Sequence, residues 1–196
     1  MLRTRTETTG GVLLRPDLGG GMAGTEEAIG DIREDAPAGA SMEPPRFLVD
    51  RTLGRLVRWL RLLGYDTVWD RLGAPAAVLA RAAEEDRVVL TRDTLLVERR
   101  PVRRGQVRAV LVRADLLAEQ LHQLRSEEGL RRRGEPRCLV CNGPLELRAP
   151  YEVRERVPRY VAQTQTRFTY CSTCDRVTWP ATHWDNMQRT LDNAGF

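Results

Sequence analysis

Lysine is absent from this chain of 196 residues, so all 31 of its basic side chains are arginines. Isoleucine is nearly absent as well, which indicates a compositional bias that runs through the whole chain. The abundance of arginine is therefore a weak guide to any partner. The distribution of charge along the chain is more informative.

Long hydrophobic segments are missing too. No apolar run approaches the roughly 20 residues that a membrane-spanning helix needs. Near the amino terminus, Arg3 and Arg5 are followed only by Val12–Leu14, which is too short for the core of a signal peptide. We also find no glycine-rich phosphate loop, no Ser-His-Asp set and no dinucleotide-binding fingerprint. These absences favour a cytoplasmic protein without a membrane anchor.

Charge is divided between two parts of the chain. Residues 1–45 carry four arginines against eight acidic residues, a net charge of −4, whereas residues 46–196 carry 27 against 19, a net charge of +8. The first part is rich in glycine, lacks apolar periodicity and ends on Pro44-Pro45, which is typical of a disordered leader. Met42, just before the first strand-like run, could be the true start codon, although a dispensable tail is the interpretation we favour. The cationic second part favours a polyanionic partner.

The four cysteines form two Cys-x-x-Cys pairs, Cys138 with Cys141 and Cys171 with Cys174. Thiolates two residues apart on a tight turn can point at one ion, and two such turns complete the tetrahedral shell of Zn²⁺. Two disulfides or two redox-active dithiols are the alternatives, but disulfides belong to exported chains. A closed shell of four sulfurs leaves no position for water or substrate. The pattern therefore predicts a structural zinc site.

From Arg46 onward, short apolar runs alternate with segments of helical periodicity. The apolar runs 47–49, 65–69, 88–90 and 107–112 are typical of buried parallel strands. Apolar spacing predicts helices over residues 53–63, 75–83 and 116–124, the first of them capped by Thr52 and ended by Gly64. This alternation predicts an α/β fold, with a parallel sheet flanked by helices on both faces. An arginine-rich hinge at 131–134 leads into the cysteine module.

Four aspartates fall at or just past the carboxyl ends of the predicted strands: Asp50, Asp70, Asp93 and Asp115. In an open parallel sheet these ends share one edge, where ligands bind. Carboxylates gathered there would repel one another unless a divalent cation lay among them, and oxygen ligands suit Mg²⁺ or Mn²⁺. Such a site can activate water for in-line displacement at a phosphate. The alternative is that each aspartate caps the helix after it. For Asp50 together with Asp93 we favour the metal.

Arginines close to these aspartates are candidates for contact with a phosphate backbone. Arg51, Arg55 and Arg58 share one stripe of the first predicted helix, and Arg92 directly precedes Asp93. An ordinary solvated helix face is the alternative for this stripe.

Aromatic residues after the last cysteine are candidates for stacking on unpaired bases. His183 and Trp184 could contact a nucleic acid in this way, alongside Trp179. His183 could also replace a sulfur as zinc ligand, although four cysteines already complete the shell. The rings could equally form the core of a small ribbon, above all at Trp179.

Several motifs occur in a specific order and spacing. They are the run from Phe47 to Asp66, then Leu90-Thr-Arg-Asp93, Cys138-x-x-Cys141-Asn-Gly143, Tyr170-Cys-x-x-Cys174, and Trp179 with His183-Trp184. Over about residues 46–187 the chain resembles the Mut-type C-terminal RNase domain family, a PIN-like nuclease fused to a zinc ribbon. The resemblance implies a PIN-like nuclease domain at 46–130 and a zinc ribbon with a C-terminal tail at 131–196.

The resemblance also implies metal-dependent cleavage of RNA. Asp50 and Asp93 match the acidic metal-binding positions, and Asp115 lies near a third. One departure is that the family carries acidic residues at the start of the second helix, where this chain has Leu72-Gly-Ala-Pro75 and where Asp70 is the nearest substitute. We therefore expect a ribonuclease that uses Mg²⁺ or Mn²⁺ in addition to structural zinc. A weak or inactive PIN-like protein that binds RNA or ribosomes, or the toxin of a toxin–antitoxin pair, is the alternative.

Overall fold

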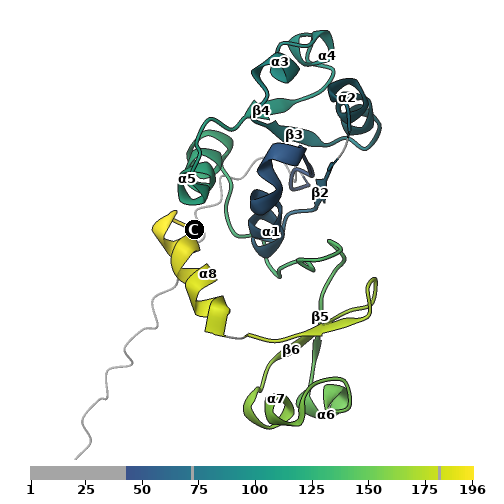
Figure 1. Ribbon diagram of the computed structural model, residues 1–196, viewed down its shortest axis with the longest axis vertical. Helices are drawn as coiled ribbons and strands as arrows, with labels where there is room; N and C mark the ends of the chain where they lie inside the picture. The colour runs from purple at the N-terminus through teal and green to yellow at the C-terminus, as the bar shows by residue number, and fades with distance from the viewer. Residues whose placement is uncertain (1–42, 72, 181) are drawn as a thin grey trace, which may run out of the picture. The chain divides into compact units, whose positions relative to one another are not determined.

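The computed structural model describes residues 43–71, 73–180 and 182–196. The predicted leader, residues 1–45, lies outside this range except at 43–45. The described residues form a parallel α/β part followed by an antiparallel β part, as Figure 1 shows. Both parts match the fold class predicted from the sequence.

The α/β part is built on a four-stranded parallel sheet in the order β2-β1-β3-β4. Its strands are β1 (Phe47–Val49), β2 (Thr67–Trp69), β3 (Val88–Thr91) and β4 (Ala109–Leu111). These runs are rich in valine, leucine and aromatic residues, which suit strands buried on both faces. In register, Leu48 of the central strand β1 lies between Val68 and Val89.

Helices cover both faces of this sheet, because successive side chains of a strand point to opposite sides. Phe47 and Val49 join the larger hydrophobic cluster, and Leu48 joins the smaller one. The larger cluster packs under α1 (Gly54–Leu62), α5 (Leu117–Glu128) and α8 (Thr182–Asn193). The smaller cluster packs under α2 (Pro75–Glu84), α3 (Thr94–Val97) and α4 (Arg100–Arg103).

The first helical segment begins differently from the prediction. A 3₁₀ turn, η1 (Arg51–Leu53), precedes α1, and its N-cap is Asp50, whose side chain accepts a hydrogen bond from the Thr52 backbone N–H. The prediction that Thr52 caps this segment was therefore wrong. Asp50 is the better cap because its carboxylate can reach the amide two residues on.

The antiparallel part is a three-stranded sheet in the order β5-β6-β7. Its elements are β5 (Glu146–Arg148), α6 (Pro150–Val153), α7 (Arg159–Thr164), β6 (Phe168–Cys171) and β7 (Arg176–Thr178). A small core of Val153, Val157 and Phe168 holds α6 and α7 against the strands, and Trp179 packs on it. The chain then returns to the first part, where α8 lies beside α5 (Figure 1).

Membrane-crossing segments can be checked only over the residues that the structure describes. There, no helix has both the length and the apolar character that a bilayer span requires.

Candidate functional site

The carboxyl ends of the four parallel strands carry the predicted aspartates. Asp50 directly follows β1, Asp70 directly follows β2, Asp93 is the second residue after the end of β3, and Asp115 lies beyond β4. Because all four strands are parallel, these ends share one edge of the sheet.

Asp50 is the most constrained of the four, since its side chain is buried at 7% exposure. One carboxylate oxygen, Oδ1, accepts hydrogen bonds from the backbone N–H and the hydroxyl group of Thr52. The other oxygen, Oδ2, accepts a hydrogen bond from the hydroxyl group of Thr91. Three donors thus fix the orientation of this carboxylate at the end of the central strand.

Thr91 links Asp50 to Asp93. Its side chain is fully buried, and its hydroxyl group donates to Asp50 while accepting from the backbone N–H of Asp93 at 2.9 Å. The Asp93 carboxylate caps α3, because Oδ1 accepts from the N–H groups of Leu95 and Leu96 at 2.8 and 3.3 Å. Sequence analysis missed this role of Thr91, although a polar residue within an apolar strand was a usable signal.

Asp70 and Asp115 have other partners. The Asp70 carboxylate accepts a hydrogen bond from Gly73 N–H at 2.6 Å, and a Cβ atom at Gly73 would lie 2.6 to 2.7 Å from both carboxylate oxygens. Gly73 thus lies close against the Asp70 carboxylate, and a larger residue at this position would require that carboxylate to shift. Asp115 is largely exposed and forms an ion pair with Arg92. Arg92 therefore lies at this edge, but its guanidinium group already neutralises a candidate ligand.

The four aspartates do not assemble into a cluster of metal ligands. Within the described part of the chain, only the cysteines bring three or more potential metal-binding side chains into mutual reach. Carboxylate oxygens are suitable ligands for Mg²⁺ or Mn²⁺, so the donor chemistry of Asp50 and Asp93 fits these ions. The metal-binding role of the aspartates stays a prediction.

The arginine stripe lies on the surface next to Asp50. Arg51, Arg55 and Arg58 are exposed, and none of them has an ion pair within the described residues. Their side chains are therefore accessible to a polyanion. This exposure is expected both for a phosphate-binding stripe and for an ordinary solvated helix face.

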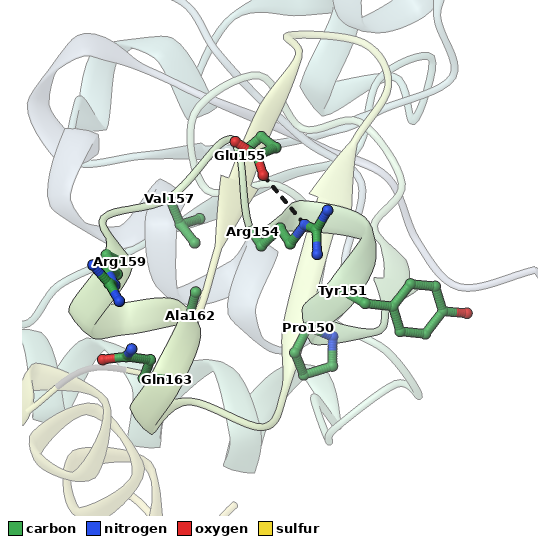
Figure 2. A pocket seen from close by; sticks show the side chains of 8 residues that line it. All are labelled: Pro150, Tyr151, Arg154, Glu155, Val157, Arg159, Ala162 and Gln163. Carbon is green, nitrogen blue, oxygen red and sulfur yellow. Dashed lines mark ion pairs between the residues drawn. The ribbon is translucent and has the colours of Figure 1, made fainter.

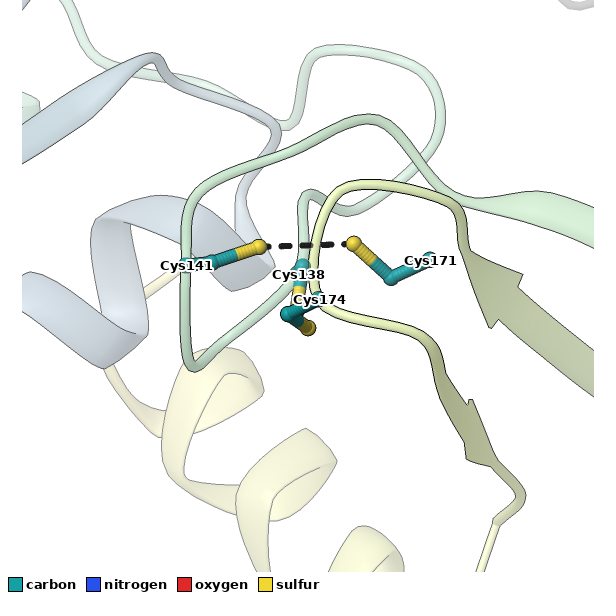
Figure 3. Close-up of side chains that lie close together, drawn as sticks. All are labelled: Cys138, Cys141, Cys171 and Cys174. Carbon is teal, nitrogen blue, oxygen red and sulfur yellow. Dashed lines mark hydrogen bonds between the residues drawn. The ribbon is translucent and has the colours of Figure 1, made fainter.

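The two Cys-x-x-Cys turns face each other, as Figure 3 shows. All four sulfur atoms lie within 4.8 Å of one another, with 3.7 Å between Cys138 and Cys174 and 3.3 Å between Cys141 and Cys171. A tetrahedral Zn²⁺ with Zn–S bonds of about 2.3 Å separates its sulfurs by about 3.8 Å. The cysteines are free thiols, and disulfide bonds need a sulfur separation near 2.05 Å. The arrangement fits zinc.

The thiols also influence one another. Burial, reinforced by the neighbouring thiols, raises the pKa of Cys174 to about 12. Burial acts in the same direction on Cys171, but hydrogen bonds from the Cys174 backbone N–H and from Cys141 outweigh it and lower the pKa of Cys171 to about 7. Four thiolates at this spacing repel one another, and a divalent cation removes that repulsion.

Backbone geometry lets the two turns approach closely. Asn142 and Asp175, each directly after the second cysteine of its pair, have positive φ angles of 72° and 54°. Asn and Asp tolerate this left-handed conformation better than most residues. Gly143 follows Asn142, and a Cβ atom there would overlap the side chain of Thr173 in the other turn.

The first turn is bound to the parallel sheet through Arg61. This arginine, buried at 8% exposure, donates to Thr67 carbonyl oxygen through Nε and Nη2 and to the carbonyl oxygens of Leu139 and Val140 through Nη1. Burial lowers the pKa of Arg61, while the nearby Cys138 and Cys141 oppose that shift. Its positive charge thus lies close to the thiolates. Sequence analysis overlooked Arg61 because it counted only arginines on the solvated face of the helix.

Asn142 makes the second connection between the two parts. Its side-chain oxygen accepts from Thr67 N–H at 3.0 Å, and its amide group donates to Asp66 Oδ1 at 2.7 Å. Since β2 is an edge strand of the sheet, the outward backbone groups of Thr67 have no neighbouring strand. Asn142 and Arg61 satisfy them instead.

The aromatic candidates near the C-terminus have different surroundings. Trp184 packs against the larger hydrophobic cluster beneath α8, and Trp179 packs on Phe168 with ring centroids 6.4 Å apart. Both rings are partly buried by this packing, and contact of Trp184 with RNA stays a prediction. The side chain of His183 lies outside the described residues.

Comparison with known proteins gives a match at the level of the family. No curated protein and no solved structure matches the chain. The family described as the Mut7-C RNAse domain matches residues 45–191, which span the parallel sheet, the cysteine site and nearly all of α8. The chain therefore belongs to the Mut7-C RNAse domain family.

Proposed function

We propose that this protein is a divalent-metal-dependent ribonuclease whose reaction takes place at the carboxyl edge of the parallel sheet. Membership of an RNase domain family implies ribonuclease activity with RNA as the substrate. The observation that supports the site is the buried Asp50 carboxylate, which Thr91 connects to Asp93. A carboxylate held by three donors at a strand end is suited to bind a cation without reorganising.

The residues have separate roles in this proposal. Asp50 and Asp93 hold the catalytic ion, with Asp115 and Asp70 as further candidates on the same edge. A bound Mg²⁺ or Mn²⁺ supplies an activated water and stabilises the negative charge that develops on the phosphate during in-line attack. Arg51, Arg55 and Arg58 align the RNA backbone beside this edge. Zinc at the four cysteines is structural, and the cytoplasm is the proposed location.

A second candidate function is RNA binding without cleavage. The observation in its favour is that Asp50 and Asp93 are both N-caps, a role that requires no metal. Residues 72–75, before and at the start of α2, also lack the acidic residues that the family resemblance leads us to expect there. In this alternative the protein keeps the fold and the basic surface of a nuclease but has lost its reaction.

Substitution of the two aspartates by asparagine separates these candidates. Asparagine caps a helix as well as aspartate does, so Asp93→Asn should fold and melt close to the wild type. Asp50→Asn keeps an acceptor for the Thr52 N–H but loses the second oxygen that accepts from Thr91, so it should fold with a stability lower by about 1–3 kcal/mol. If the carboxylates bind the catalytic ion, each variant should lose Mn²⁺-dependent cleavage of RNA, because the amide is a poor substitute for a charged ligand. Cleavage of total RNA with and without Mn²⁺ is the assay.

The control is Asp86→Asn. Asp86 lies at the opposite end of β3, is exposed, and has a φ angle of 50° that asparagine also accepts. This variant should cleave like the wild type. Full activity of Asp50→Asn or Asp93→Asn would remove the metal site from the proposal. Absence of cleavage in the wild type, with RNA binding intact, would favour the second candidate.

A further inference from the structure

Exposed aromatic rings are rare in this protein. Tyr65 is buried against Phe47, with ring centroids 5.3 Å apart. Tyr170 is covered by the guanidinium groups of Arg148 and Arg156, at 5.4 and 5.0 Å from its ring centroid. Tyr151 and Tyr160 differ, since they are 75% and 73% exposed.

Both exposed tyrosines belong to the same insertion, residues 149–167, which connects β5 to β6 and contains α6 and α7. A hollow of about 590 Å³ lies between these two helices. Figure 2 shows the side chains that line it, with Pro150 and Tyr151 on α6 and with Arg159, Ala162 and Gln163 on α7. Tyr160 does not line the hollow, but it follows Arg159 directly on α7.

One arginine of the insertion is available to a polyanion. The basic residues of the insertion are Arg154, Arg156, Arg159 and Arg167, and its acidic residues are Glu152 and Glu155. Arg156 forms an ion pair with Asp175, and Arg167 forms one with Glu135. Glu155 forms an ion pair with Arg154 at 3.2 Å, which Figure 2 marks, and Glu152 accepts a hydrogen bond from Ala149 N–H at 2.6 Å. Arg159 has no ion pair among the described residues, so its guanidinium group is available to a phosphate.

We propose that the α6–α7 insertion is a binding surface for single-stranded RNA, on which the rings of Tyr151 and Tyr160 stack with unpaired bases while Arg159 contacts the phosphate backbone. Base stacking on exposed aromatic side chains is the common way in which proteins hold single strands, and it tolerates any base. A duplex cannot use these rings, because its bases already stack on one another. The surface therefore favours unpaired RNA over a duplex, and in taking RNA as the ligand it rests on the proposed function.

A binding assay with the full-length, zinc-loaded protein tests this inference. Buffers without Mg²⁺ or Mn²⁺ keep binding separate from cleavage. The probe is a short fluorescent single-stranded RNA, compared with the same strand annealed to its complement. The double variant Tyr151→Ala/Tyr160→Ala should bind the single strand at least about tenfold more weakly and the duplex equally well. The matched control Tyr151→Phe/Tyr160→Phe keeps both rings and should bind as the wild type does.

The role of Arg159 has a different signature. Arg159→Ala should lower the slope of log affinity against log salt concentration by roughly 0.7, the value for one lost contact with a single-stranded backbone. The tyrosine variants should leave this slope unchanged, since stacking releases no counterions. Melting temperature and zinc content should match the wild type in every variant, because the substituted side chains are exposed.

Three outcomes would overturn the inference: wild-type affinity of the alanine pair, an equal loss in the phenylalanine pair, or an equal loss for duplex RNA. The first of these would leave a protein partner as the occupant of the surface. Failure here is distinguishable from failure of the proposed function. If the wild type cleaves RNA and the alanine pair binds RNA equally well, the proposed function stands and this binding surface is refuted. If RNA binding depends on the tyrosines but the wild type does not cleave RNA, the surface stands and the proposed function is refuted.

Discussion

At the scale of single residues, Thr91 decides how the Asp50 carboxylate is presented. Its hydroxyl group is fully buried and serves two partners at once, Asp50 as acceptor and Asp93 N–H as donor. Thr91→Val has nearly the same shape but removes the hydroxyl group, which leaves both partners unsatisfied. A buried polar group without a partner costs about 1–3 kcal/mol. The variant should therefore be less stable and should orient Asp50 poorly.

We expect Thr91→Val to lower Mn²⁺ affinity and cleavage by about 10- to 100-fold, the usual effect of losing a residue that orients a metal ligand. Thr91→Ser retains the hydroxyl group and should recover most of this loss. Titration of cleavage with Mn²⁺ distinguishes the two explanations, since a purely structural defect would lower stability without changing the Mn²⁺ dependence. Equal Mn²⁺ affinity in Thr91→Val and the wild type would contradict the positioning role.

At the scale of elements, the two cysteine turns are alike in backbone but differ in what they contact. Asn142 and Asp175 occupy equivalent places and share a left-handed conformation. The Asn142 side chain bonds to Thr67 and Asp66 of the parallel part, whereas the exposed Asp175 bonds to Arg156 and Tyr170 within the ribbon. Only the first turn therefore connects the two parts.

Glycine substitutions measure this difference, because glycine accepts a positive φ angle at either position. Asn142→Gly should destabilise the protein by about 1–3 kcal/mol, since it leaves the buried Thr67 N–H without an acceptor. Asp175→Gly, the matched control, should cost much less than Asn142→Gly, because its ion pair with Arg156 is exposed to solvent. Urea unfolding of both variants gives the free energies. Equal costs would show that the Asn142 contacts contribute nothing.

At the scale of the whole molecule, the zinc ribbon and the parallel sheet are not independent modules. Arg61 and Asn142 tie the first cysteine turn to β2, and α8, which follows the ribbon in the chain, contributes Leu191 and Ala194 to the larger hydrophobic cluster. Loss of zinc should therefore affect the sheet as well as the ribbon. The effect should be strongest at β2, because Arg61 and Asn142 hold the first cysteine turn against that strand.

Zinc removal tests this coupling. Four thiolates that close one site contribute on the order of 10 kcal/mol to folding, so Cys171→Ser or strong chelation should unfold the ribbon. Amide hydrogen exchange should then rise at Thr67–Trp69 of β2 and stay slow at Ala109–Leu111 of β4, which is at the far edge of the sheet. Metal analysis should find zinc in proportion to protein. Unchanged exchange at β2 would show that the ribbon folds separately.

The sequence by itself determined the fold class, the zinc site and the family, because each depends on local patterns. Apolar runs of strand length alternate with helical spacing along the chain, and two short cysteine spacings specify a tetrahedral site regardless of what lies between them. Residues such as Phe47, Leu48 and Val49 could be assigned to a buried strand from their order alone. Boundaries were less exact at β2 and β4, where turn geometry and backbone hydrogen bonds decide the ends.

Only the tertiary structure decided which side chains meet. Arg61 and Thr91 each satisfy a group that is distant in sequence, and no periodicity reveals such a pairing in advance. The same holds for the aromatic residues, since Trp179 and Trp184 proved to be packed while Tyr151 and Tyr160 are solvated. The exposure of an aromatic ring depends on the neighbours that folding brings together. The sequence therefore shows only that the ring is present, and the fold determines whether an RNA base could reach it.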